Sequence, residues 1–129
     1  MVNNFDISAI RQEIIDILKG IGVSQKVYPN RPKATSPASD FIVVSISNGV
    51  NDLSAYGECV IHIYLFAKDI DGLINDKKLS LMYQRLVAGF PAASGRLLFD
   101  NEWNILGDTP DDFGFHARLI RIKSTIKAI

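Results

Sequence analysis

The first apolar positions of the chain recur at helical spacing. The repeated side chains are Ile7, Ile10, Ile14, Ile17, Leu18 and Ile21. Residues three and four apart lie on one face of an α-helix, so this segment predicts an amphipathic helix. Asp6 or Ser8 can cap its start, because short polar side chains accept hydrogen bonds from the first free amides. Gly20 and Gly22 can end it.

A short strand, a loop and a longer strand are expected next. Residues 25–28 predict a strand that stops at Pro29, since proline lacks the amide donor of a β-ladder. Residues 29–39 contain three prolines and no large apolar side chain, which predicts a surface loop. Residues 41–47 are β-branched and aromatic without helical period and predict a strand. Asparagine, glycine and aspartate within 48–52 predict a reversal of the chain there.

Residues 55–68 alternate as a strand does, and both of its faces are apolar. One face carries Cys59, Ile61, Ile63, Leu65 and Ala67, and the other carries Glu58, Val60, His62, Tyr64 and Phe66. The first face is expected in the core. On the second face, Val60, Tyr64 and Phe66 would form a contiguous apolar patch on a monomer, so we expect something to cover it.

A second helix is predicted over 73–88, after a capping segment at 69–72. Its apolar stripe consists of Leu79, Met82, Tyr83, Leu86, Val87 and Phe90. Pro91 and Gly95 are expected to end it. Beyond it, short strands near 96–99 and 103–106, a turn at 107–112 and a final strand over 113–126 are predicted.

The element order is therefore α-β-β-β-α-β-β-β. A long hairpin strand, then a helix, then further strands predicts an α+β fold, in which two principal helices pack on one face of a mainly antiparallel sheet. The chain has 129 residues, of which 47% are apolar, which suits a single domain spanning 1–129.

The net charge and the composition of the first residues limit the kinds of partner and compartment that we expect. Fourteen basic residues balance fourteen acidic ones, so no global positive charge would hold nucleic acid or an anionic membrane. The start of the chain lacks a basic region before an apolar block, and no apolar run is long enough to span a membrane. A single cysteine, Cys59, suits a reducing compartment as a buried structural thiol. We therefore expect a soluble cytosolic protein.

Motifs for catalysis are absent from the sequence. The usual phosphate, dinucleotide, zinc and acyl-transfer signatures do not occur. His62 and His116 could approach each other if their strands pair, but Cys59 and His62 are an odd number of residues apart and point to opposite faces of a strand. The carboxylates at 69, 71, 108, 111 and 112 and the serines at 24, 36 and 39 suit capping, turns and solvent. We expect no catalytic residue, no metal site and no cofactor.

The final strand carries a basic strip formed by Arg118, Arg121 and Lys123, with Lys127 beyond it. Lysine and arginine can protect an exposed sheet edge from promiscuous pairing. They can also form a charged contact between subunits, for example with the acidic 107–112 turn of a neighbour. The sequence leaves both interpretations open.

The order of elements and several segments resemble the tail-completion (tail terminator) proteins of long-tailed bacteriophages and the related head-tail joining proteins. The segments are RQEIIDILKGIG, KVYPNRP, DFIVVSISNG, ECVIHIYLFAKD, KKLSLMYQRLVAGF and FHARLIRIKSTI. The resemblance is architectural and spans nearly the whole chain. None of these segments is a catalytic fingerprint, and no functional residue is carried over.

The resemblance implies a phage or prophage structural protein that is not an enzyme. It would form a homo-oligomeric ring, usually a hexamer, that caps the tail tube and joins it to the head connector. Its partners would be itself, tail-tube proteins and head-connector proteins, in the host cytoplasm during assembly and at the tail neck of the virion. The interface candidates are Val60, Tyr64, Phe66, Arg118, Arg121 and Lys123. Residues 30–39 could form an arm to a neighbour or a plain surface loop.

Two alternatives remain at the level of sequence. The chain could be a small ligand-binding domain or enzyme with a pocket between sheet and helices that uses His62, His116 or Asp112. It could also be an adaptor in another assembly, such as a contractile injection system. Fold by itself does not separate these.

Overall fold

The computed structural model describes residues 6–24, 26–30, 40–52 and 56–127. Helix α1 spans Ile7–Ile21, as predicted. Asp6 caps it by accepting a hydrogen bond from the amide of Ser8 at 3.1 Å. Gly22 ends it in the left-handed conformation, with φ of 75°, which glycine adopts without a Cβ clash. The expected Pro-rich loop lies mostly outside the described residues.

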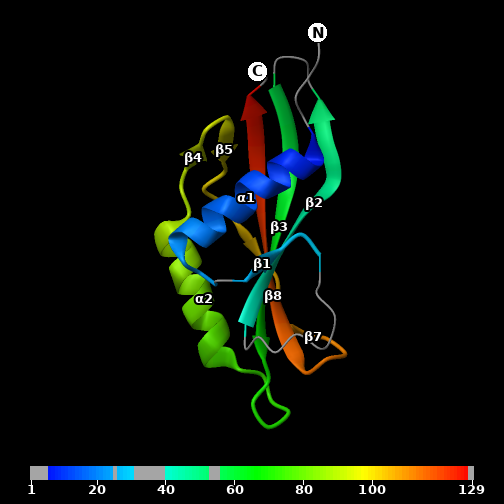
Figure 1. The fold of residues 1–129 in the computed structure, drawn as a ribbon, viewed down its shortest axis with the longest axis vertical. Coiled ribbons are helices and arrows are strands. Elements are labelled where there is room, and N and C mark those ends of the chain that lie inside the picture. Colours follow the sequence, from blue (N-terminus) through cyan, green and yellow to red (C-terminus); the bar gives the residue numbers. More distant parts are fainter. Residues whose placement is uncertain (1–5, 25, 31–39, 53–55, 128–129) are drawn as a thin grey trace.

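One eight-stranded sheet forms the centre of the molecule. Its strands are β1 (Val27–Tyr28), β2 (Asp40–Asp52), β3 (Tyr56–Lys68), β4 (Ala93–Ser94), β5 (Leu97–Phe99), β6 (Asn104–Ile105), β7 (Thr109–Pro110) and β8 (Phe115–Lys127). Their order is β1-β2-β3-β8-β5-β4, and β6 and β7 also pair with β8. All neighbours are antiparallel except β1 and β2, which run parallel. The long strands β2, β3 and β8 lie at the centre of the sheet (Figure 1).

The chain reverses after the strand as predicted, but later than 48–52, since β2 ends at Asp52 and the antiparallel β3 begins at Tyr56. Strand β2 continues to Asp52, and its register against β3 shifts between Ser47 and Asn51. Such an irregularity absorbs turn-forming residues without ending a strand. Two strands, β4 and β7, were not predicted, and β7 lies inside the segment expected to be a turn. Each has only two residues, too few for a periodic signal.

Helix α2 spans Asp76–Gly89 and begins later than predicted. The residues before it form a tight turn in which Asp71 and Gly72 have positive φ. Asn75 is the actual cap and accepts a hydrogen bond from the amide of Lys78 at 3.2 Å. Leu79, Met82 and Leu86 of the predicted stripe are buried, but Val87 is 51% exposed.

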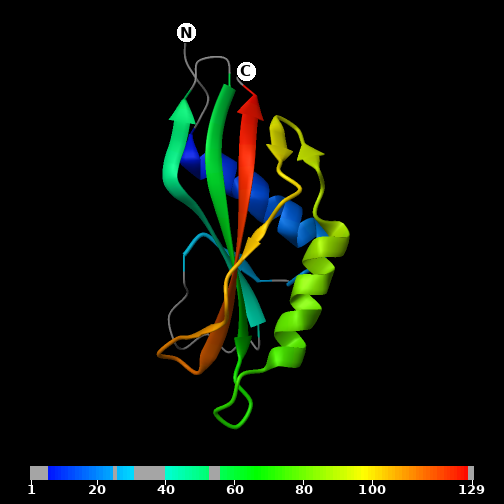
Figure 2. The same ribbon diagram turned by 180° about the vertical axis from the view of Figure 1, so that it is seen from behind.

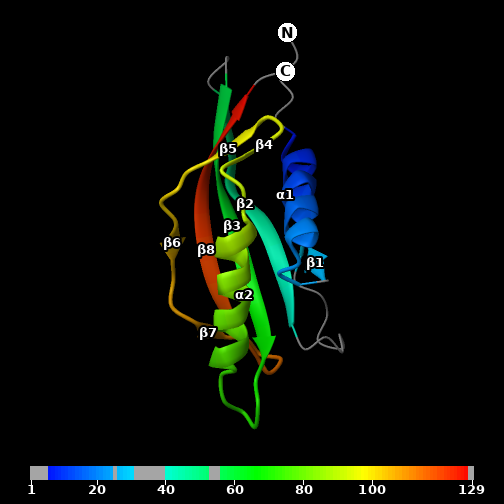
Figure 3. The same ribbon diagram turned by 90° about the vertical axis from the view of Figure 1, so that its left-hand side faces the viewer.

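The main core lies between the two helices and one face of the sheet, and Figure 3 shows both helices on that side. It contains the predicted face of β3, namely Cys59, Ile61, Ile63, Leu65 and Ala67. The helices contribute Ile10, Ile14, Leu18, Leu79, Met82 and Leu86. The α+β architecture with helices on one face of a mainly antiparallel sheet is thus confirmed.

Candidate interaction surface

The face of the sheet turned away from the helices is seen in Figure 2; we call it the helix-free face. The register of β2, β3 and β8 sets its side chains in rows. These rows are Phe41–Phe66–Ala117, Val43–Tyr64–Leu119 and Ser45–His62–Arg121. Val60 and Lys123 are also paired and follow next along the strands. The face is therefore apolar at one end and polar towards the other.

The apolar end forms a second core within the chain. Phe41 is fully buried and stacks on Phe66 with ring centroids 4.5 Å apart. Phe115 meets Phe41 edge-on at 5.2 Å. Phe66 is only 8% exposed. The expectation that this face would be covered is met here by the chain itself, and Phe66 offers little surface to a neighbour.

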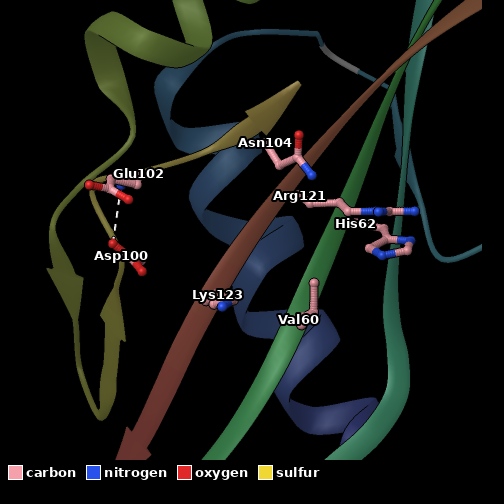
Figure 4. A pocket seen from close by; sticks show the side chains of 7 residues that line it. All are labelled: Val60, His62, Asp100, Glu102, Asn104, Arg121 and Lys123. Carbon is pink, nitrogen blue, oxygen red and sulfur yellow. Dashed lines mark hydrogen bonds between the residues drawn. The ribbon is translucent and has the colours of Figure 1, made fainter. Parts of the chain in front are cut away.

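The polar end contains an open hollow of about 420 Å³ (Figure 4). Its lining residues are Val60, His62, Asp100, Glu102, Asn104, Arg121 and Lys123. Arg121 reaches from β8 across β3 towards His62. Burial, together with the positive charge of Arg121, lowers the pKa of His62, so this ring is neutral near pH 7. Tyr64 lies two residues further along the same face of β3, and its hydroxyl is 3.4 Å from Nδ1 of His62.

Arg121 and Lys123 are exposed, and neither forms an ion pair with any described residue. The opposite wall of the hollow comes from the segment between β5 and β6, which runs along β8. It supplies Asp100 and Glu102, which the sequence analysis did not single out. A pair of acids two residues apart beside a strand could have been noticed, but their place next to β8 depends on the tertiary fold.

Arg118 lies on the other face of β8, contrary to a single basic strip. Its guanidinium donates to both carboxylate oxygens of Asp108, at 2.7 and 2.9 Å, and to Asp76 at 3.3 Å. The hydrogen bond that Arg118 donates to Asp108 is the main cause of the raised pKa of Arg118. The acidic turn thus pairs with its own chain. Because β8 has strands on both sides, the edge-protection interpretation is also wrong.

The two histidines do not meet. His62 pairs with Arg121, whereas His116 pairs with Ala67, five residues further along β3 and hence on the opposite face. His116 Nδ1 instead lies 2.6 Å from a carboxylate oxygen of Asp69. The hollow therefore contains His62 but neither His116 nor Asp112, and it lies on the helix-free side instead of between sheet and helices.

Among the described residues, no group of three or more His, Cys, Asp or Glu side chains is placed to bind a metal ion. Cys59 is buried in the main core, which raises its pKa to about 11. Asp111 accepts from the amides of Phe113 and Phe115, a turn role. Ser24 accepts from the amide of Lys26, while Ser36 and Ser39 lie outside the described residues.

No helix within the described ranges is long and apolar enough to cross a membrane. No family model matches the sequence, and a search of curated proteins finds no match. Among solved structures, the chain is similar to one described as "Virion of native gene transfer agent (GTA) particle". The TM-score is 0.52 and the identity 8%, and the alignment covers 97% of this chain and 95% of that one. The two chains therefore share a fold along nearly their whole length.

Proposed function

We propose that this protein is a structural, non-enzymatic subunit of a phage, prophage or gene transfer agent particle. In this role it forms a ring that caps the tail tube and joins it to the head connector. The observation that carries the proposal is the fold shared almost end to end with a chain of a gene transfer agent virion. The alignment covers 97% of this chain and 95% of that one.

The helix-free face supports a role in assembly. Val60 and Tyr64 are half-buried there beside the exposed Arg121 and Lys123. A surface with aromatic and aliphatic groups next to unpaired cations offers both apolar area and charge to a partner. In our account these four residues contact another subunit or a neighbouring tail component.

Phe66 and Arg118 act differently in this account. Phe66 lies beside Tyr64, with ring centroids 6.3 Å apart, and stacks on Phe41, so it holds the shape of this face. Arg118 orders the acidic segment around Asp108 within its own subunit. Both would influence assembly through the shape of the subunit instead of by direct contact.

The proposal is tested by deleting the gene from the phage, prophage or gene transfer agent that carries it. Electron micrographs should then show heads and tails that are not joined, with tails of irregular length. Wild-type protein supplied in trans should restore joined particles, and Tyr64→Asp should not. Normal particles from the deletion strain would overturn the proposed function.

A further inference from the structure

The turn between β3 and α2 carries three exposed aliphatic side chains. Ile70, Leu73 and Ile74 are 58%, 71% and 37% exposed; we call them the aliphatic knob. Figure 1 shows this turn projecting beyond the end of the sheet. Large aliphatic groups gathered at a protruding tip are costly in water unless a partner covers them.

The knob is held in one shape. Ile70 and Leu73 exchange two backbone hydrogen bonds of 2.9 Å, and the positive φ of Asp71 and Gly72 closes the turn between them. Both ends are fastened to β8, since His116 lies 2.6 Å from Asp69 and Arg118 lies 3.3 Å from Asp76. A preorganised knob loses little conformational entropy when it binds.

A second feature of the same molecule is an apolar hollow of about 430 Å³ beside the later half of α2. We call it the aromatic hollow; its main lining residues are Tyr83, Val87, Phe90, Phe99, Trp103 and Ile105. Phe90 packs against Phe99 and Trp103, with ring centroids 4.7 and 5.6 Å apart. The indole nitrogen of Trp103 donates to the carbonyl of Asp100, so its polar group is satisfied and the ring can be buried.

Val87 and Ile105 are 51% and 46% exposed in the hollow. The knob of the same subunit cannot reach them. It precedes the first turn of α2, whereas Tyr83 and Val87 lie towards the end of this 14-residue helix. At about 1.5 Å per residue, α2 is a rigid spacer of roughly 20 Å in total. An apolar projection and an apolar hollow at separate places on one molecule are the two unlike surfaces that a heterologous contact between copies needs.

Charge favours the same pairing. Lys77 lies three residues after Ile74, is exposed and forms no ion pair with the described residues. Asp71 inside the turn is exposed as well, so Lys77 is the group that can face an acidic partner. Asp100, which borders the aromatic hollow, and Glu102 are likewise exposed without an ion pair in that part of the chain. Opposite charges around an apolar centre set the orientation of a docking contact.

We propose that the aliphatic knob of one subunit inserts into the aromatic hollow of the next. This contact would join neighbouring subunits of the proposed ring. The pairing of knob and hollow is head-to-tail whether or not the ring closes, so only closure depends on the proposed function. The knob is small beside the roughly 800 Å² that each partner buries in a standard interface. It therefore acts as the anchor of a wider contact.

Cross-linking tests the pairing directly. Leu73→Cys and Val87→Cys proteins carrying different tags are mixed and treated with a short bismaleimide. The mixture should give a covalent heterodimer that neither variant gives alone, and the double variant should give a ladder of higher species. Wild type serves as the control because Cys59 is buried. A mixture that yields no more dimer than the single variants overturns the inference.

Matched substitutions give a second readout. Leu73→Asp and Val87→Asp should each abolish self-association, because each would bury an unpaired charge. Leu81→Asp is the control, since Leu81 is exposed on α2 outside both features. An equal loss of self-association in all three variants would contradict the pairing. Self-association that survives Leu73→Asp would contradict it too, and would mean that something other than the knob occupies the hollow.

The inference and the proposed function fail in different ways. Closed rings in negative-stain images without a 73–87 cross-link would remove the knob contact and leave the ring role intact. A specific 73–87 cross-link with only open chains would support the contact and remove the closed ring.

Discussion

Tyr64 and Phe66 lie two residues apart on the same face of β3, yet their surroundings differ. Phe66 belongs to the second core, whereas Tyr64 is only half-buried. We predict that Phe66→Asp unfolds the protein, because it buries a charge among aromatic rings at a cost of several kcal/mol. Tyr64→Asp should leave a folded subunit with a cooperative thermal transition by circular dichroism. A Phe66→Asp protein that melts like wild type would contradict the second core.

Arg118 fastens two acidic groups and is only 15% exposed at its side chain. Removing it in Arg118→Ala leaves the partly buried Asp108 carboxylate without its partner, so we predict a loss of about 1–3 kcal/mol in the free energy of unfolding. Arg118→Lys should recover only part of this, since an ammonium group cannot make the two-pronged contact. Urea unfolding measures both.

Arg121→Ala is the matched control for Arg118. Arg121 occupies the same strand but is exposed and has no ion pair with a described residue. Its removal should change the free energy of unfolding by less than about 0.5 kcal/mol. Equal effects at the two positions would argue against the Arg118 network.

At the scale of elements, the end of α1 offers a test with two neighbouring glycines. Gly20 is helical, and a Cβ there meets nothing within 4 Å, as is also true of Gly22 with its φ of 75°. Gly20→Ala should stabilise the protein by about 0.4–1 kcal/mol by restricting the unfolded chain. Gly22→Ala should destabilise it by about 1 kcal/mol because of left-handed strain. Melting temperatures that shift in the same direction for both variants would contradict the assignment of Gly22 as the left-handed cap of α1.

Long elements were predictable because they repeat a period many times. The helical spacing from Ile7 to Ile21 and the alternation around Ile61 and Ile63 each fix a face as well as an element type. The start of α2 was not predictable, since aspartate and asparagine both cap helices and only the tight turn at Asp71 excludes the earlier start. The two-residue strands depend on their partners, since β1 pairs with β2, β4 with β5, and β6 and β7 with β8.

The candidate surface was predictable in part for the same reason. Alternation places Val60, Tyr64 and Phe66 on one face, but it does not reveal that Phe66 is buried in one cluster with Phe41 and Phe115. It also places Arg118 and Arg121 on opposite faces, because they are three residues apart. They form one strip only in the sequence, because Arg118 pairs with Asp108 in the turn before β8 and with Asp76 at the start of α2.

At the scale of the whole molecule, the subunit has unlike surfaces. The helix-free face carries Tyr64 beside Arg121 and Lys123. The turn that bears the knob projects from one end (Figure 1), and the aromatic hollow lies beside α2. Unlike surfaces that pair head to tail produce a ring if the rotation between neighbours closes, and a filament if it does not. Our account requires closure.

The most direct test of this account is the mass of the purified protein in solution, measured by light scattering after size-exclusion chromatography over a wide concentration range. A single chain has a mass of 14.3 kDa. We predict a concentration-dependent shift to one discrete closed oligomer, about six subunits under the tail-terminator role that we propose, seen as rings in negative stain. A strict monomer at every concentration, or an open-ended series of masses, would contradict the account.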